Sequence, residues 1–187
     1  MKTAHLKSLM IAAGFSLTAA FAPAANAQHT TPMPDHSHDM APAQNMPGIY
    51  SELPDDHTLG AKDAPVTMII YASVTCPHCS HWFSSVWPSL KASHVDTGKV
   101  RIVFREFPTA PAGLAYAGFL LANCAPEGEF FPVLEYQMEQ QDSLMEAAKT
   151  GKGREAYFEV AKLAGLKDDA AMDACLADET KLAKIDK

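Results

Sequence analysis

Two cysteines separated by two residues, in the run Cys76-Pro77-His78-Cys79, are the residues of this 187-residue sequence best suited to chemistry. Thiol–disulfide exchange needs one exposed thiolate and a second thiol close enough to resolve the mixed disulfide. A C-x-x-C spacing at the start of a helix provides both, because the second cysteine then lies one turn behind the first. The pair therefore predicts a redox-active centre.

The two thiols are expected to have different roles. At the mouth of a helix, Cys76 faces unpaired backbone N–H groups and the positive end of the helix dipole, which favour its thiolate form. Cys79 lies one turn deeper and should stay protonated until it attacks. His78, when cationic or donating a hydrogen bond, stabilises the Cys76 thiolate further and makes the disulfide a stronger oxidant. Pro77 suits the first helical position, where its missing N–H is not needed.

Other interpretations of these residues stay open. Cys76 and Cys79 could be half of a zinc site, which needs two further Cys or His ligands at paired spacing, or they could form a purely structural disulfide. His81, one turn after Pro77, is interpreted as a solvated helix residue and not as a catalyst. Glu106 could relay a proton to Cys79 if it points inwards, but we expect it to be exposed at a strand end and leave it out of the site.

The sequence around the pair predicts a βαβ unit over residues 66–108. Val66–Ala72 is a short apolar run of β-forming residues, which favours a strand buried on both faces. A helix then begins at Pro77, and Pro88 is expected to kink it. Val100–Phe107 is a second apolar strand, and a crossover of this length makes the two strands parallel.

The rest of the chain, residues 110–187, is predicted to be helical. Its apolar residues recur at helical spacing, and glycines such as Gly165 end individual segments. Asp168 is interpreted as the N-cap of the last helix. The expected helices cover Ala112–Ala125, Phe130–Gln141, Ser143–Lys149, Arg154–Ala164 and Asp168–Ile185.

Cys124 and Cys175 lie in two of these expected helices. In an oxidising compartment we favour a structural disulfide between them, which clamps the helical region. Closing a loop of about 50 residues would be worth about 4 kcal/mol in the chain-entropy model. The alternative is two buried free thiols that act as small hydrophobic side chains.

The N-terminal residues predict export. Lys2 and Lys7 precede a short apolar run, and small residues ending in Ala25-Asn26-Ala27 complete a signal peptide over residues 1–27, with cleavage after Ala27. The apolar run is too short for a permanent membrane anchor. Cleavage leaves 13 basic against 22 acidic side chains, a net charge of −9, which argues against nucleic acid or an anionic membrane as a partner. The expected location is the periplasm.

Residues 28–54 are predicted to be a disordered linker rich in His, Met and Pro, followed by a folded domain at residues 55–187. The linker carries His29, His36 and His38, whose imidazoles, together with nearby methionine thioethers, are ligands that copper accepts. We favour a tether with incidental histidines over weak metal capture. No metal and no other cofactor is therefore assigned.

The sequence around the cysteines closely resembles the DsbA-like family of thioredoxin-fold proteins. The resemblance runs from about Asp56 to Lys187 and rests on Leu59–Thr67 (LGAKDAPVT), Tyr71–Cys79 (YASVTCPHC) and Phe104–Pro108 (FREFP). It implies a thioredoxin-like α/β fold with an inserted helical domain, and a membrane quinone-linked oxidase that recharges the protein. It also implies Cys76 as the attacking nucleophile and Cys79 as the resolving thiol. Some bacterial members look similar in carrying a second cysteine pair in the insert.

One feature of the family has no counterpart in this sequence. In the family, the insert is followed by a β-hairpin, which opens with a cis-proline after Thr or Val, and then by a last helix. No Thr-Pro or Val-Pro flanked by strand sequence follows residue 110, and the sequence is still helical in character at Lys187. We therefore expect either an incomplete sequence or a natural short form with a partial sheet.

Four functions are compatible with these residues. The first is an enzyme that introduces or exchanges disulfide bonds in exported proteins through Cys76 and Cys79, with a membrane redox partner. The second is a periplasmic isomerase or reductase, and the third is a copper-binding redox-protective protein that uses the linker. The fourth is an inactive fragment of the family. We favour the first.

Overall fold

The computed structural model describes residues 52–186 of the chain. The predicted signal peptide at residues 1–27 and the weak metal candidates His29, His36 and His38 lie outside this range. Within the described range, no helix has both the length and the apolar character that crossing a bilayer requires.

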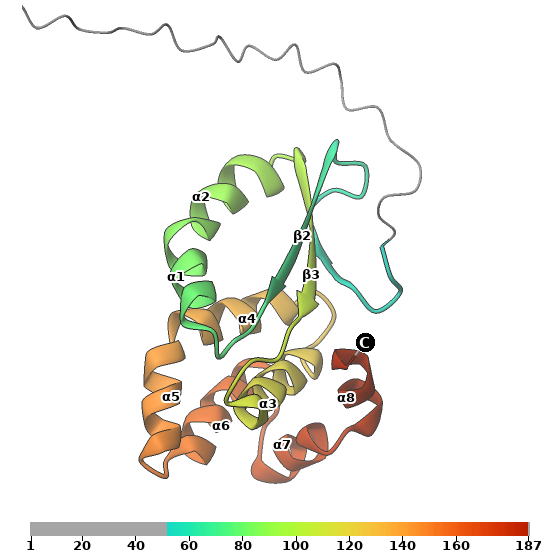
Figure 1. The fold of residues 1–187 in the computed structure, drawn as a ribbon. Helices are drawn as coiled ribbons and strands as arrows, with labels where there is room; N and C mark the ends of the chain where they lie inside the picture. Colours follow the sequence, from blue (N-terminus) through green and yellow to red (C-terminus); the bar gives the residue numbers. More distant parts are fainter. Residues whose placement is uncertain (1–51, 187) are drawn as a thin grey trace, which may run out of the picture. The chain divides into compact units, whose positions relative to one another are not determined.

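A three-stranded sheet carries the candidate site (Figure 1). Strand β3 (Val100–Glu106) lies in the centre, with β1 (His57–Leu59) antiparallel on one side and β2 (Val66–Ala72) parallel on the other. The register pairs Ala72 with Glu106, so β2 and β3 end level with each other. The parallel pair confirms the predicted βαβ arrangement, whereas the short strand β1 was not predicted.

The prediction that β2 is buried on both faces is wrong. Among the described residues β2 pairs with β3 alone, so it is an edge strand, and Val66 is 52% exposed and Tyr71 58% exposed. Central strand β3 does hold buried residues on both faces, including Val103 and Phe104. The exposed Val66 and Tyr71 therefore reflect the preference of these side chains for a pleated backbone, whereas Ile70 packs partly buried against the core.

The crossover from β2 to β3 is a broken helix. It consists of α1 (Pro77–Ser85), α2 (Trp87–Leu90) and a π-helical turn (Lys91–Val95). The break between α1 and α2 falls at Val86, just before Pro88. Since proline has no N–H to donate to the preceding turn, the hydrogen-bond ladder of α1 cannot pass through it, and the predicted kink is confirmed.

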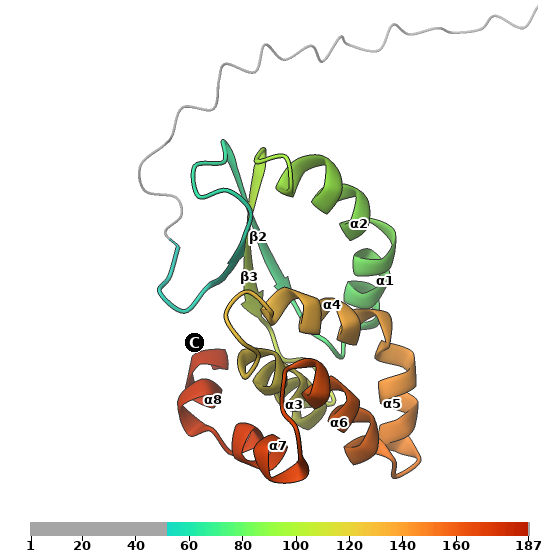
Figure 2. The same ribbon diagram turned by 180° about the vertical axis from the view of Figure 1, so that it is seen from behind.

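Six helices follow β3 in the described chain and gather beyond the carboxyl ends of β2 and β3 (Figures 1 and 2). They are α3 (Ala112–Asn123), α4 (Phe130–Glu139), α5 (Gln141–Lys149), α6 (Gly153–Leu163), α7 (Asp169–Leu176) and α8 (Glu179–Ile185). Asp168 caps α7, as predicted, by accepting a 2.8 Å hydrogen bond from the Ala171 N–H. The single helix predicted for Asp168–Ile185 is wrong, because Asp178 caps a second helix by accepting from the Lys181 N–H at 3.0 Å.

An aromatic cluster joins the sheet to the helices. Phe104, in the middle of β3, is fully buried. Its ring centroid lies between 5.8 and 6.4 Å from those of Phe83 in α1, Phe119 in α3, and Phe130 and Phe131 in α4. Aromatic pairs at such separations stabilise a fold beyond the area they bury. The sheet and the helical insert therefore share one hydrophobic core.

Candidate active site

Cys76 is the last residue before α1, at the end of the loop Ser73–Thr75 that follows β2. Its backbone is extended (φ −91°, ψ 114°), and its carbonyl oxygen accepts the N–H groups of Cys79 at 3.0 Å and Ser80 at 3.1 Å. Pro77 occupies the first turn of α1. The Cys76 thiol is thus partly exposed at a helix N-terminus, where the backbone dipoles favour an anion.

Cys79 lies one turn further along α1, and both cysteines are free thiols. Burial raises the pKa of the Cys79 thiol to about 11, and a hydrogen bond with the Cys76 side chain raises it as well, whereas the backbone of Ser73 acts in the opposite direction. A thiol that stays protonated at neutral pH is a poor attacking group, although it can resolve a mixed disulfide once deprotonated. The two thiols are therefore not equivalent.

The two histidines near the thiols are both exposed. His78 lies between the cysteines in the first turn of α1, and its stabilising effect on Cys76 stays a prediction. His81 is one turn further on, and its exposure agrees with its interpretation as a solvated helix residue.

Hydroxyl groups hold the loop that leads to Cys76. The hydroxyl oxygens of Ser73 and Thr75 lie 3.0 Å apart, and the Thr75 hydroxyl donates to the Thr109 carbonyl at 3.0 Å. The Thr109 N–H in turn donates to the Ser73 hydroxyl at 3.2 Å. Thr109 belongs to the segment after β3 and precedes the cis peptide bond between Ala110 and Pro111. This network ties the ends of the two parallel strands together. None of these hydroxyl groups was predicted, although Ser73 and Thr75 stand beside the motif.

Helix α4 braces the crossover helix with two polar contacts. The Ser80 hydroxyl of α1 donates to the Met138 carbonyl at 2.7 Å. The Trp87 Nε1–H of α2 donates to Glu135 Oε1 at 2.8 Å. The helical insert therefore holds the helix that carries the thiols along its length, and not only at one end.

A buried glutamine of the insert also reaches the loop. Gln141, the first residue of α5, is 3% exposed, and its Nε2 group donates to the carbonyls of Val74 at 2.8 Å and Cys76 at 3.1 Å. This contact could not be predicted from the sequence, because glutamine is usually exposed and Val74 is 67 residues away.

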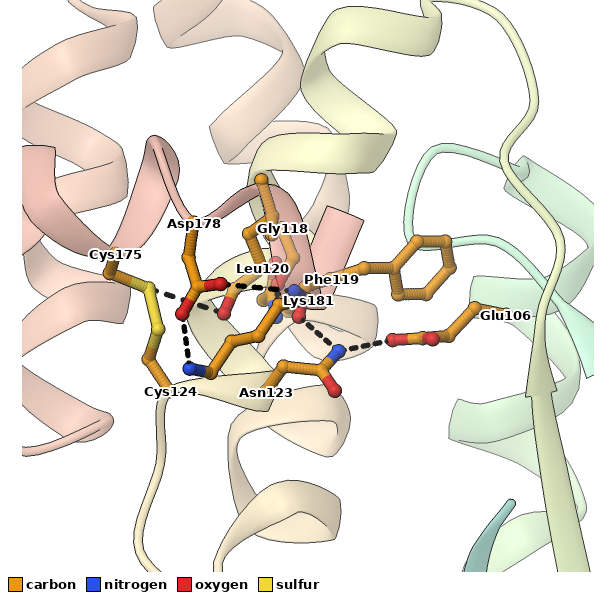
Figure 3. The surroundings of a disulfide bond; sticks show 10 residues. Glu106, Gly118, Phe119, Leu120, Asn123, Cys124, Cys175, Asp178 and Lys181 are labelled. Atoms are coloured by element: carbon orange, nitrogen blue, oxygen red, sulfur yellow. Dashed lines mark hydrogen bonds and ion pairs between the residues drawn. A yellow bond between two sulfur atoms is a disulfide. The ribbon is translucent and has the colours of Figure 1, made fainter. Parts of the chain in front are cut away.

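Glu106 is buried, so the expectation that it is exposed at a strand end is wrong. Its side chain is 7% exposed and lies on the same side of β3 as Phe104, where it accepts a 2.5 Å hydrogen bond from Asn123 of α3 (Figure 3). Burial raises the pKa of Glu106 to about 7, although the Asn123 bond acts against this. His57 Nε2 lies 3.8 Å away, and burial lowers the pKa of His57 to about 4. Between these pH values both side chains are neutral, so their contact is not an ion pair.

A proton relay from Glu106 to Cys79 finds no support in these contacts. The polar groups that act most on the pKa of Cys79 are the Cys76 side chain and nearby backbone groups. Glu106 and His57 instead line a pocket of about 690 Å³, and neither cysteine of the motif borders it. The pocket is therefore separate from the thiol site.

Cys124 and Cys175 form a disulfide bond that joins the end of α3 to α7 (Figure 3). Their Cα atoms are 6.2 Å apart, and the two residues are separated by 51 positions in the sequence. Because both sulfurs are used in this bond, neither can complete a zinc site with Cys76 and Cys79. In the part of the chain that the structure describes, no group of three or more His, Cys, Asp or Glu side chains could hold a metal ion.

Comparisons with known proteins agree with this arrangement. The sequence profile of the thioredoxin family matches residues 52–187. A Rickettsia bellii protein, whose name assigns it provisionally to the protein-disulfide oxidoreductases, is 31% identical over 126 residues, which cover 67% of this chain and 46% of that protein. A Rickettsia typhi protein with a similar provisional name is 30% identical over 145 residues, covering 71% and 51%.

A solved structure shows the same fold. The crystal structure of α-DsbA1 from Wolbachia pipientis has a TM-score of 0.64 and is 32% identical, and the match covers 72% of this chain and 65% of that one. The chain spans about half the length of the curated relatives it matches. The similarity extends over the strands, the crossover helix and the helical insert described above.

Proposed function

Because the chain belongs to the DsbA-like thioredoxin family, we propose that it is a thiol–disulfide oxidoreductase with Cys76 and Cys79 as its redox centre. The observation that carries this proposal is the unequal environment of the two thiols at the start of α1. Both thiols are partly exposed, but Cys76 occupies the helix N-cap, whereas partial burial and the hydrogen bond with Cys76 raise the pKa of Cys79. An accessible attacking thiol with a protonated partner behind it is the arrangement that disulfide exchange requires.

The proposed reaction transfers two electrons from a dithiol substrate to the protein. A substrate thiolate attacks the Cys76 sulfur of the Cys76–Cys79 disulfide, which breaks this bond and forms a mixed disulfide. Cys79 leaves as a thiolate and takes up a proton, which its raised pKa favours. A second substrate thiolate then attacks the substrate sulfur and releases Cys76. The substrate gains one disulfide, and the protein ends as a dithiol that a membrane redox partner reoxidises.

The proposed substrates are exported proteins that carry cysteines, and the proposed location is the periplasm. The signal-peptide pattern of residues 1–27 supports export. The Cys124–Cys175 disulfide supports it as well, because such bonds persist in oxidising compartments.

A redox titration of the protein lacking residues 1–27 tests the proposal. We expect the Cys76–Cys79 pair to exchange with glutathione as one two-electron couple. A potential of about −120 mV would identify an oxidase, and one of about −180 mV or lower would identify an isomerase or reductase. A wild-type protein whose Cys76 and Cys79 do not exchange with glutathione would refute the proposal.

Two cysteine variants serve as controls for this titration. Cys76→Ala is expected to abolish exchange, because the attacking sulfur is gone. In Cys79→Ala, the Cys76 thiolate is expected to attack oxidised glutathione, release one glutathione thiolate and accumulate as a mixed disulfide with glutathione, because the resolving thiol is gone. Exchange that continues unchanged in Cys76→Ala would place the redox chemistry elsewhere.

A further inference from the structure

The carbonyl oxygen of Cys76 accepts three N–H groups. Two belong to Cys79 and Ser80 in the first turn of α1, and the third belongs to the side chain of Gln141 in the insert. The same amide group also donates to the carbonyl of Val74, and its two N–H bonds allow it to serve both oxygens at once. Gln141 therefore contacts the backbone on both sides of Thr75, the residue that precedes Cys76.

This contact supports a backbone angle on which the thiol depends. The direction of the Cys76 carbonyl is set by ψ of Cys76, which is 114°. The same rotation sets how the Cys76 sulfur lies relative to the first turn of α1, whose N–H groups stabilise a thiolate. Without the Gln141 amide, this carbonyl would be held only by the N–H groups of Cys79 and Ser80, and the Val74 carbonyl would lose its bond to the insert.

We propose that Gln141 is a positioning residue for the Cys76–Cys79 centre, an inference that rests on the proposed function. It acts through the backbone, because it holds the Val74 and Cys76 carbonyls and with them the loop that places Cys76 at the N-cap of α1. Stabilising the thiolate stabilises the reduced protein and makes the disulfide a stronger oxidant. The helical insert thereby takes part in setting the redox potential of the thioredoxin-like core.

A matched control lies four residues earlier in the chain. Gln137 of α4 is fully buried, and its Nε2 group donates to the carbonyls of Gly118 at 3.1 Å and Val133 at 3.3 Å. Like Gln141, it is a buried glutamine whose amide group donates to two backbone carbonyls. Its hydrogen bonds, however, stay within the insert.

The test compares Gln141→Met with Gln137→Met, which each remove two hydrogen bonds and keep the length of the side chain. Two quantities are measured: the glutathione redox equilibrium of the protein lacking residues 1–27, and the pH profile of Cys76 alkylation in its reduced form. Gln141→Met is expected to make the couple less oxidising by about three- to tenfold in equilibrium constant, or about 15–30 mV, and to move the alkylation profile to higher pH. Gln137→Met is expected to leave both at the wild-type value.

An unchanged redox equilibrium in folded Gln141→Met, or an equal shift in both variants, would overturn the inference. If Gln141→Met does not fold, Gln141→Asn and Gln137→Asn give the same comparison, since asparagine keeps the amide but withdraws it by one methylene. A shift in the same direction is then expected for Gln141→Asn alone. A wild-type protein with no exchangeable couple would refute the proposed function itself, so the two failures are distinguishable.

Discussion

Asn123 donates a 2.5 Å hydrogen bond to Glu106, and it does so from the position next to Cys124 of the insert disulfide (Figure 3). The end of α3 is therefore held on one side by a covalent bond to α7 and on the other by a buried carboxyl group of the sheet. These two attachments lead to separate predictions about stability.

Glu106→Gln is expected to change how stability depends on pH. Burial raises the pKa of Glu106 from 4.5 to about 7, so the native state keeps a proton that the unfolded chain has lost, and stability falls as pH rises between these values. The full effect is about 3 kcal/mol. Glutamine keeps an acceptor for Asn123 without titrating. As pH rises over this range, the free energy of unfolding of the variant should therefore increase relative to that of the wild type. Urea unfolding at a series of pH values measures the difference.

His57 has the opposite effect on the pH dependence of stability and therefore provides the control. Burial lowers its pKa from 6.5 to about 4, so the unfolded chain binds more protons between these values and stability rises with pH. The two slopes oppose each other where the ranges overlap, between about pH 4.5 and 6.5. His57→Gln should expose the fall caused by Glu106. A Glu106→Gln profile that runs parallel to the wild-type profile would contradict this account.

Replacing both Cys124 and Cys175 with alanine is expected to lower the free energy of unfolding by about 4 kcal/mol. The chain-entropy model gives this value for a loop closed across 51 residues. Both residues must be changed, because a single remaining thiol could exchange with Cys76. Urea unfolding without reductant measures the loss. A loss below about 1 kcal/mol would mean that helix packing alone holds α3 to α7.

Alkylation of the reduced protein near pH 8 is expected to modify Cys76 and to spare Cys79. Burial holds the pKa of Cys79 at about 11, so its reactive thiolate is scarce at this pH. Mass spectrometry after iodoacetamide treatment locates the modification. In Cys76→Ser, Cys79 should stay protected, which separates the effect of burial from any effect of modifying its neighbour. Equal modification of both thiols would disagree with the assigned roles.

Phe104→Ala is expected to destabilise the protein by about 3–5 kcal/mol, because it leaves a cavity among four aromatic rings. Phe107→Ala is the matched control. Phe107 is 59% exposed, and its loss should change stability by no more than about 0.5 kcal/mol. Urea unfolding of the two variants tests the contrast, and similar losses would show that Phe104 is not central to the core.

The elements around the thiols could be predicted because their signals are local. The apolar run of Val66–Ala72 and the prolines at positions 77 and 88 act on their own stretch of backbone, whatever lies around them. The same reasoning missed the boundary at Asp178, because the apolar spacing continues across it. It also missed β1, whose three residues are too few to show a period.

The burial of polar side chains could not be predicted, because distant residues decide it. Glu106 is buried by α3, where its partner Asn123 is 17 residues away. Gln141 meets Val74 across 67 residues. Likewise, the exposure of β2 depends on which strands pair with it, and the pairing of strands cannot be predicted from the composition of β2 alone.

The cluster around Phe104 makes the helical insert a poor candidate for transplantation. A graft of the insert onto another scaffold would carry Phe119, Phe130 and Phe131 without the ring that now packs against them. Those side chains would then face water and favour aggregation. A chimera between relatives would therefore need a compatible aromatic residue at the middle of the recipient's central strand.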